Sequence, residues 1–78
     1  MAYVMLPELG EGIKSATVAI WHVKEGDCVD AGQDIVEMVT DKATFNVPAG
    51  QGGKIKKVLA KLGEEIDIGQ PLALIEKA

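Results

Sequence analysis

Lys42 is the residue whose position most suggests chemistry. It lies in the segment Thr40-Asp41-Lys42-Ala43, between strand-like residues 35–39 and 44–47. This arrangement predicts a hairpin with Asp41 and Lys42 at or near its tip. Aspartate suits a tight turn because its carboxylate can accept a nearby backbone N–H, whereas lysine has no such reason to be there. A lysine amine that two strands hold in water is open to amide formation, which would remove its positive charge.

Other residue types that carry chemistry are scarce. One histidine, His22, and one cysteine, Cys28, are too few for a zinc site with its usual four ligands. No third residue stands out to orient these two as a catalytic pair. The segment 10–12 is too short for a dinucleotide fingerprint, and Lys14-Ser15 lacks the preceding glycines of a phosphate loop. We therefore expect no metal site, and little favours a nucleophilic active site.

The composition limits the kinds of partner. The chain has 78 residues and a formal net charge of −4, with twelve acidic residues, eight lysines and no arginine. Acidic proteins repel a phosphate backbone, and arginine is the usual residue for bidentate recognition of phosphates, so we expect no nucleic-acid binding. No apolar stretch approaches the roughly 20 residues of a spanning helix, so we expect no membrane insertion. One cysteine cannot form an internal disulfide, so no oxidising compartment is implied.

Short apolar runs, each of strand length, alternate with glycine, proline and acidic residues. The runs are residues 3–6, 18–23, 35–39, 45–47, 55–59 and 72–75. Nine glycines in so short a chain indicate many turns, and no window of ten residues shows a convincing helical period. This pattern predicts one small all-β domain, a barrel or a sandwich, over residues 1–78.

The two halves of the sequence resemble each other at a shift of 37 residues. The shift aligns Lys24, Gly26, Asp30, Gly32 and Gln33 with Lys61, Gly63, Asp67, Gly69 and Gln70. Each half then consists of a strand, a Gly–acidic turn, a short strand, a Gly–Gln turn and a strand. Chance similarity is the alternative. We favour two related halves packed about a pseudo-two-fold axis, because neither half can bury its apolar face alone.

The segment Thr40-Asp41-Lys42-Ala43 resembles the T-D-K-A lipoylation motif of dihydrolipoamide acyltransferases, which are components of 2-oxo acid dehydrogenase complexes. The resemblance covers essentially the whole chain, through residues 7–13, Trp21-His22-Val23-Lys24, Gly26-Asp27-Cys28-Val29, Gly32, Ile35, Glu37, Val47-Pro48, Gly53 and Ile55. The chain departs from the family at Val39, where a polar or acidic residue is common, and in the glycine-rich turn 49–53. These departures leave the partner preference open.

This resemblance implies a lipoyl domain. The implied fold is a flattened β-barrel or sandwich of two roughly four-stranded antiparallel sheets, with pseudo-two-fold symmetry and the lysine on an exposed hairpin turn. Lys42 is then the lipoyllysine, carrying covalently attached lipoic acid. Asp41 and Ala43 flank it for recognition by a lipoate ligase or lipoyl transferase, although Asp41 is expected to serve the turn more than recognition.

The resemblance also assigns roles away from the lysine. A loop near it is expected to take part in partner recognition, through Glu8, Gly10, Glu11, Gly12 and Ile13; an ordinary solvated loop is the alternative. Strand spacing favours a core position for Trp21 and a solvent-facing one for Glu37. Cys28 is expected to be a small structural residue.

The function implied is that of a swinging-arm carrier, which is not an enzyme by itself. The dithiolane of the lipoyl group is a strained disulfide and therefore reacts readily with nucleophiles. In the family, a thiamine diphosphate-dependent decarboxylase acylates this ring, the acyltransferase core passes the acyl group to coenzyme A, and dihydrolipoamide dehydrogenase reoxidises the dithiol. Tethering raises the effective concentration of the acyl group to about the mM range when linkers are short. Pyruvate, 2-oxoglutarate and branched-chain 2-oxo acids all remain open as the acid served.

Two alternatives share the barrel. A biotin carrier would be expected to have methionine on both sides of the lysine, where this chain has Asp41 and Ala43. An unmodified adaptor would carry no prosthetic group at all. The chain is expected to be one domain from the N-terminal part of a longer acyltransferase, monomeric alone and oligomeric in the parent protein. Its expected location is the cytoplasm of a bacterium or archaeon, or the mitochondrial matrix of a eukaryote.

Overall fold

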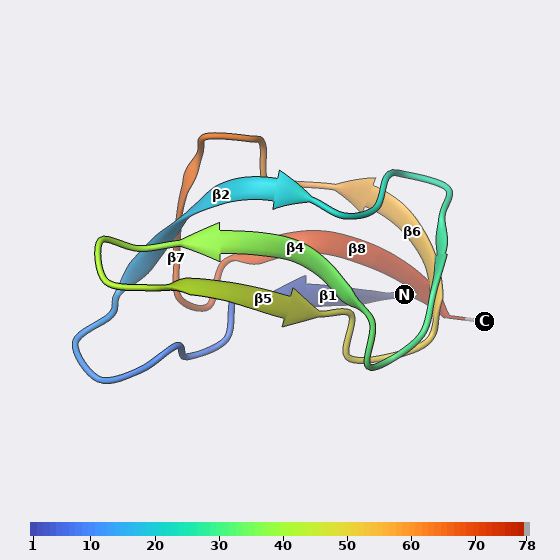
Figure 1. Ribbon diagram of the computed structural model, residues 1–78. Coiled ribbons are helices and arrows are strands. Elements are labelled where there is room, and N and C mark those ends of the chain that lie inside the picture. The colour runs from blue at the N-terminus through green and yellow to red at the C-terminus, as the bar shows by residue number, and fades with distance from the viewer. Residues whose placement is uncertain (78) are drawn as a thin grey trace.

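The computed structural model describes residues 1–77 and consists of strands joined by turns and loops (Figure 1). The strands are β1 (Ala2–Met5), β2 (Ser15–Trp21), β3 (Cys28–Val29), β4 (Asp34–Val39), β5 (Thr44–Pro48), β6 (Gly53–Val58), β7 (Glu65–Asp67) and β8 (Pro71–Lys77). Each of the six apolar runs overlaps a strand, so the all-β prediction is confirmed. Nothing in residues 1–77 forms a helix of the length and apolar character that crossing a membrane requires.

The strands form two four-stranded antiparallel sheets, in the orders β1-β8-β6-β3 and β5-β4-β2-β7. A shift of 37 residues maps β2, β3 and β4 onto β6, β7 and β8, and β5 then corresponds to β1. Irregularities repeat as well. The register of β2 against β4 shifts between Val18 and Ile20, and that of β6 against β8 shifts between Ile55 and Lys57. The predicted pseudo-two-fold relation between the halves is therefore confirmed.

The residues that recur at this shift make the same turn hydrogen bonds in both halves. The backbone N–H of Asp30 donates to Gln33 Oε1 at 3.2 Å, and that of Asp67 donates to Gln70 Oε1 at 2.8 Å. In the Gly–acidic turns, the Lys24 and Lys61 N–H groups donate to the carboxylates of Asp27 and Glu64. The sequence repeat therefore reflects side chains that close equivalent turns.

The core lies between the two sheets and is apolar throughout the described residues. Its most completely buried large side chains are Leu6, Ile35, Met38, Ile55, Leu72 and Ile75. Trp21 is half-buried, packs against this core and donates its Nε1–H to the carbonyl oxygen of Ala60 at 2.8 Å, as expected of a core tryptophan. On β6, an added Cβ at Gly53 would clash with the carbonyl oxygen of Glu76, so β6 and β8 approach each other as closely as they do only because residue 53 is glycine.

The molecule is elongated, with extents of 35 × 21 × 17 Å, and its two ends are built differently. The β4–β5 turn, which contains Lys42, projects at one end, and the long connection from β1 to β2 lies near it (Figure 1). The start of β1 and the end of β8 lie toward the opposite end. The scaffold thus presents the candidate lysine away from the points where the chain enters and leaves the two sheets.

Candidate functional site

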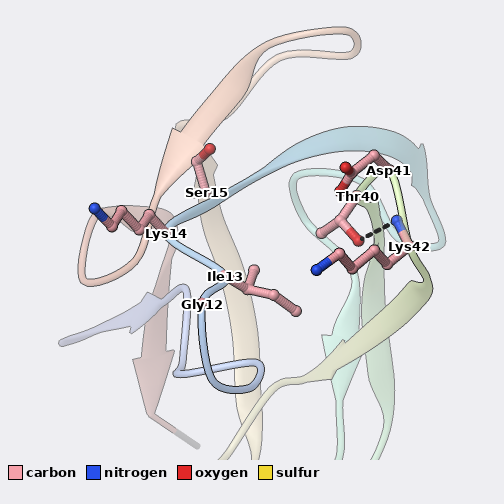
Figure 2. A pocket seen from close by; sticks show the side chains of 7 residues that line it. All are labelled: Gly12, Ile13, Lys14, Ser15, Thr40, Asp41 and Lys42. Atoms are coloured by element: carbon pink, nitrogen blue, oxygen red, sulfur yellow. Dashed lines mark hydrogen bonds between the residues drawn. The ribbon is translucent and has the colours of Figure 1, made fainter.

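Lys42 lies at the tip of the β4–β5 hairpin, as predicted. The two strands pair up to Val39 and Thr44, and residues 40–43 close the turn through a 2.8 Å hydrogen bond from Thr40 N to Ala43 O. The lysine is exposed, and Figure 2 shows its side chain extending from the turn. The amine is therefore accessible to another protein while its backbone is held between two strands.

Thr40 organises this turn. Its Oγ1 accepts hydrogen bonds from the backbone N–H groups of Lys42 at 3.2 Å and Ala43 at 3.0 Å, and its hydroxyl lies 3.1 Å from the Ala43 carbonyl oxygen as a donor. The threonine hydroxyl thus makes the contacts that the sequence analysis expected of the Asp41 carboxylate. We did not predict this role for Thr40, although hydroxyl residues commonly bind backbone groups two or three positions on.

The backbone angles of the turn agree with a loop of four residues. Four-residue hairpin loops such as 40–43 are most often built around a type I turn, whose central residues have negative φ. Within residues 1–77 every positive φ belongs to a glycine, so Asp41 and Lys42 both have negative φ. The hydrogen bonds from the Lys42 and Ala43 N–H groups to Thr40 Oγ1 stabilise this loop. Asp41 and Ala43 are both exposed beside the lysine, where a modifying enzyme can reach them.

The β1–β2 connection lies against the lysine turn. A groove of about 290 Å³ is lined by Gly12, Ile13, Lys14 and Ser15 on one side and by Thr40, Asp41 and Lys42 on the other. Figure 2 shows the Ile13 side chain projecting from the loop toward Lys42. Of the five loop residues predicted for recognition, Gly12 and Ile13 therefore share this groove with the lysine. Lys14 and Ser15 also line it, and we did not predict them as site residues.

The remaining predicted loop residues lie in the same connection but do not line the groove. Glu8, Gly10 and Glu11 are exposed. A 3.2 Å hydrogen bond from Ile13 N to the carbonyl oxygen of Gly10 closes a tight turn within the loop, and Gly10 and Gly12 both have positive φ. The two glycines therefore shape the loop that presents Ile13.

A second groove runs beside the first, along the start of β2. Its volume is about 330 Å³, and it is lined by Ser15, Ala16, Thr17, Val39, Thr40, Asp41 and Glu65. Ser15 Oγ donates to Glu65 Oε2 at 2.7 Å. Val39, where the sequence departs from the family pattern, thus shares a groove with two acidic residues, Asp41 and Glu65. Glu65 was not predicted as a site residue.

Other chemistry-bearing residues lie outside these grooves. His22 Nε2 lies 2.9 Å from Asn46 Oδ1, so its hydrogen-bond partner is an amide and not Cys28. Cys28 is exposed on the short strand β3. Glu37 is half-buried on β4, opposite Asn46 on β5. Among residues 1–77 there is no group of three or more His, Cys, Asp or Glu side chains placed to hold a metal ion.

Comparison with known proteins identifies similar domains in acyltransferases. A family model described as "Biotin-requiring enzyme" matches residues 2–75. The chain is 39% identical over 75 residues to the dihydrolipoyllysine-residue succinyltransferase component of the 2-oxoglutarate dehydrogenase complex of Staphylococcus saprophyticus, covering 96% of this chain and 18% of that protein. It is 41% identical over 71 residues to the mitochondrial lipoamide acyltransferase component of the branched-chain alpha-keto acid dehydrogenase complex of Bos taurus, covering 91% and 15%. The chain thus spans less than a fifth of the length of these relatives.

A solved structure shows the same fold at nearly full coverage. The lipoyl domain of the 2-oxoglutarate dehydrogenase complex from Azotobacter vinelandii has a TM-score of 0.75 to this chain, with 31% sequence identity. The match covers 96% of this chain and 95% of that domain. The predicted sandwich of two four-stranded sheets is therefore confirmed by both the topology and this comparison.

Proposed function

Because this chain belongs to the biotin–lipoyl attachment family, we propose that it is a lipoyl carrier domain and that Lys42 receives lipoic acid through an amide bond. The observation that carries this proposal is the exposed lysine at the tip of a hairpin whose backbone Thr40 holds. The curated relatives and the solved domain supply the identity of the group, since their names refer to dihydrolipoyllysine, lipoamide and lipoyl.

The residues around Lys42 fit such a group. The grooves beside the turn are open at the surface, so they suit a group carried on the outside of the domain. The Thr40 hydrogen bonds keep the turn rigid, which gives the attached arm a defined origin. When bound, the lipoyl group supplies a strained disulfide that accepts an acyl group. The protein's own part is to hold that group and to display the surface by which partners recognise it.

Lipoate fits better than biotin at this lysine. The family model covers both kinds of attachment, but the sequence has Asp41 and Ala43 where a biotin carrier is expected to have methionines. Both residues are exposed beside the amine, where an attaching enzyme meets them first. The proposed modifying enzyme is therefore a lipoate ligase or lipoyl transferase.

The proposed partners are those of a 2-oxo acid dehydrogenase complex. A thiamine diphosphate-dependent decarboxylase would load the arm, an acyltransferase core would pass the acyl group to coenzyme A, and dihydrolipoamide dehydrogenase would reoxidise the dithiol. Recognition by the decarboxylase is proposed for the loop residues Glu8, Gly10, Glu11, Gly12 and Ile13, of which Gly12 and Ile13 share a groove with the lysine turn. In this proposal the chain forms part of a longer acyltransferase, in a bacterial or archaeal cytoplasm or a mitochondrial matrix.

Intact-mass measurement tests the central proposal. The domain is incubated with lipoate, ATP and a lipoate ligase, and in parallel with biotin, ATP and a biotin ligase. We expect one lipoyl increment, none in Lys42→Arg and an unchanged increment in Lys61→Arg, which removes an exposed lysine from a different turn. A biotin increment, or no increment with either enzyme, would reject the proposal.

A further inference from the structure

The connection from β1 to β2 is longer than the fold requires. The pseudo-two-fold relation provides the comparison, because Leu6 and Ala49 hold equivalent positions. Their N–H groups donate to the carbonyl oxygens of Gln70 and Gln33, which are 37 residues apart. From Ala49, residues 50–52 reach the buried Gly53, whereas from Leu6 the chain takes residues 7–15 to reach the equivalent Ala16. The additional residues lie beside the Lys42 turn, so closing the sheets does not account for them.

This connection carries an apolar side chain that the core does not use. Leu9 packs against the core, but Ile13 is half-buried and belongs neither to the core nor to the residues packed on it. Its side chain lies over Gly10, where an added Cβ would be 3.5 Å from Ile13 Cδ1, and it points toward Lys42 (Figure 2). An isoleucine left partly in water outside the core contributes less to folding than a buried one, since the hydrophobic effect requires burial.

Both walls of the groove between Ile13 and Lys42 are held in place. On the loop side, Ile13 N donates to Gly10 O at 3.2 Å, and the neighbouring Lys14 carbonyl oxygen accepts from Ile68 N at 2.9 Å. On the turn side, Thr40 holds the backbone of Lys42. Lys14 points away from Lys42 in Figure 2, so Ile13 is the loop side chain that faces the lysine.

Modification of Lys42 changes what this groove can bind. The free ammonium group is strongly hydrated and keeps the end of the side chain in water. Amide formation removes the charge and adds a methylene chain and a dithiolane ring, which gain by leaving water. A groove of about 290 Å³ with an isoleucine on its wall is large enough to contact part of such a chain.

We propose that the groove between Ile13 and Lys42 is a docking site for the domain's own lipoyl arm, in which the arm's methylenes lie against Ile13 when no partner enzyme holds it. This inference rests on the proposed lipoylation of Lys42. It assigns Ile13 a second role beside partner recognition, because an enzyme that binds the loop competes with the arm for the same side chain. A partner enzyme that binds the loop therefore releases the arm from the groove.

NMR of the lipoylated domain, with loading verified by intact mass, tests this docking. We expect nuclear Overhauser effects between the Ile13 methyl groups and the methylene protons of the arm, and shift changes across residues 12–15 on lipoylation. A domain acetylated at Lys42 serves as the charge control, because acetylation removes the charge without adding the arm. It is expected to leave residues 12–15 nearly unchanged.

Substitutions locate the contact. Ile13→Ser is expected to lower the ratio of docked to free arm by about threefold to tenfold, the change expected when one aliphatic contact is lost, and Ile13→Val to retain docking. Ile20→Ser, at a residue that is 47% exposed on β2, is the matched control and is expected to change nothing. Loading without any Ile13-to-arm effect, or equal losses in both serine variants, would overturn the docking site. Failure to load at all would instead count against the proposed function.

Discussion

Within residues 1–77 the two ends of the molecule carry equivalent grooves, and the proposed site lies at one of them. One groove is lined by Ser15, Ala16, Thr17, Val39, Thr40, Asp41 and Glu65, and the other by Cys28, Val29, Asp30, Gly52, Gly53, Lys54, Glu76 and Lys77. With the exception of Asp41, each residue of the first groove has its counterpart in the second at a shift of 37 residues. The grooves therefore follow from the strand arrangement itself.

What distinguishes the Lys42 end is what has been added to the scaffold. There the strands β4 and β5 are joined by the turn 40–43, whereas the equivalent strands β8 and β1 are paired but not consecutive in the sequence. The connection from β1 to β2 is also longer than its counterpart from β5 to β6. A repeated scaffold thus forms both ends, and the proposed function lies in a turn and a loop at one of them.

The largest loss of stability is expected at Gly53, where the equivalent position in the other half is Ala16. Gly53→Ala places a Cβ against the Glu76 carbonyl oxygen and 2.7 Å from Ile75 Cγ2, so the paired strands β6 and β8 must separate. We expect a loss of about 3 kcal/mol in the free energy of unfolding, measured by urea denaturation, which is the upper end for overpacking. At Gly52 the added Cβ would lie 3.6 Å from the Val29 carbonyl oxygen, so Gly52→Ala should change stability by less than about 0.5 kcal/mol. Equal effects of both substitutions would contradict the close approach.

The next prediction tests whether the long β1–β2 connection serves partner recognition and not the fold, by replacing it with the short β5–β6 connection. Replacing residues 7–14 with the Gly50-Gln51 segment should preserve the fold, at a cost of about 1–2 kcal/mol because Leu9 no longer packs on the core. Loading of Lys42 by a lipoate ligase should persist. Reductive acylation is then measured with purified decarboxylases specific for pyruvate, 2-oxoglutarate or branched-chain acids. With the decarboxylase that acylates the unaltered domain, the rate should fall at least about tenfold, which corresponds to roughly 1.4 kcal/mol. Undiminished acylation would show that recognition lies elsewhere.

The strands and their symmetry were predictable from the sequence because burial imposes a pattern on residue types. The runs at 35–39 and 72–75 supply buried residues to equivalent strands, and the Gly–acidic and Gly–Gln turns recur because the same hydrogen bonds close them. The bulges between Val18 and Ile20 and between Ile55 and Lys57 were not predictable. They depend on how two strands of one sheet pair, which no single run of residues encodes.

The site was predictable in part. Lys42 was predicted from its place between two strand-like segments together with the resemblance of residues 40–43 to a lipoylation motif, and its exposed place at the hairpin tip is confirmed. The role of Thr40 was missed because a hydroxyl and a carboxylate can both accept backbone N–H groups, and the choice depends on turn angles that appear only in three dimensions. The approach of Ile13 to Lys42 was not predictable from residue spacing, since these residues are far apart in the chain and only the sheet topology brings their loops together.

A smaller effect is expected from the residue that holds the functional turn. Thr40→Val keeps the shape of the side chain but removes the hydroxyl that three hydrogen bonds share. Because water can replace these bonds at an exposed turn, we expect the free energy of unfolding to fall by only about 1 kcal/mol. Hydrogen exchange of the Lys42 and Ala43 amides should nevertheless accelerate. Thr44→Val, an exposed position on the adjacent strand, is the control and should leave both amides unchanged.

The smallest effect tests whether the two halves are energetically as well as geometrically equivalent. Gln33→Ala and Gln70→Ala each remove a side-chain oxygen that accepts from the backbone N–H of an aspartate three residues earlier. Each should lower the free energy of unfolding by about 0.5–1 kcal/mol, as expected for an exposed hydrogen bond, and the two losses should agree within error. The double variant should show the sum of the two losses, because the turns share no partners. A clearly larger loss at one turn would mean that the attached turn and loop, and not the repeated scaffold alone, set the stability of that end.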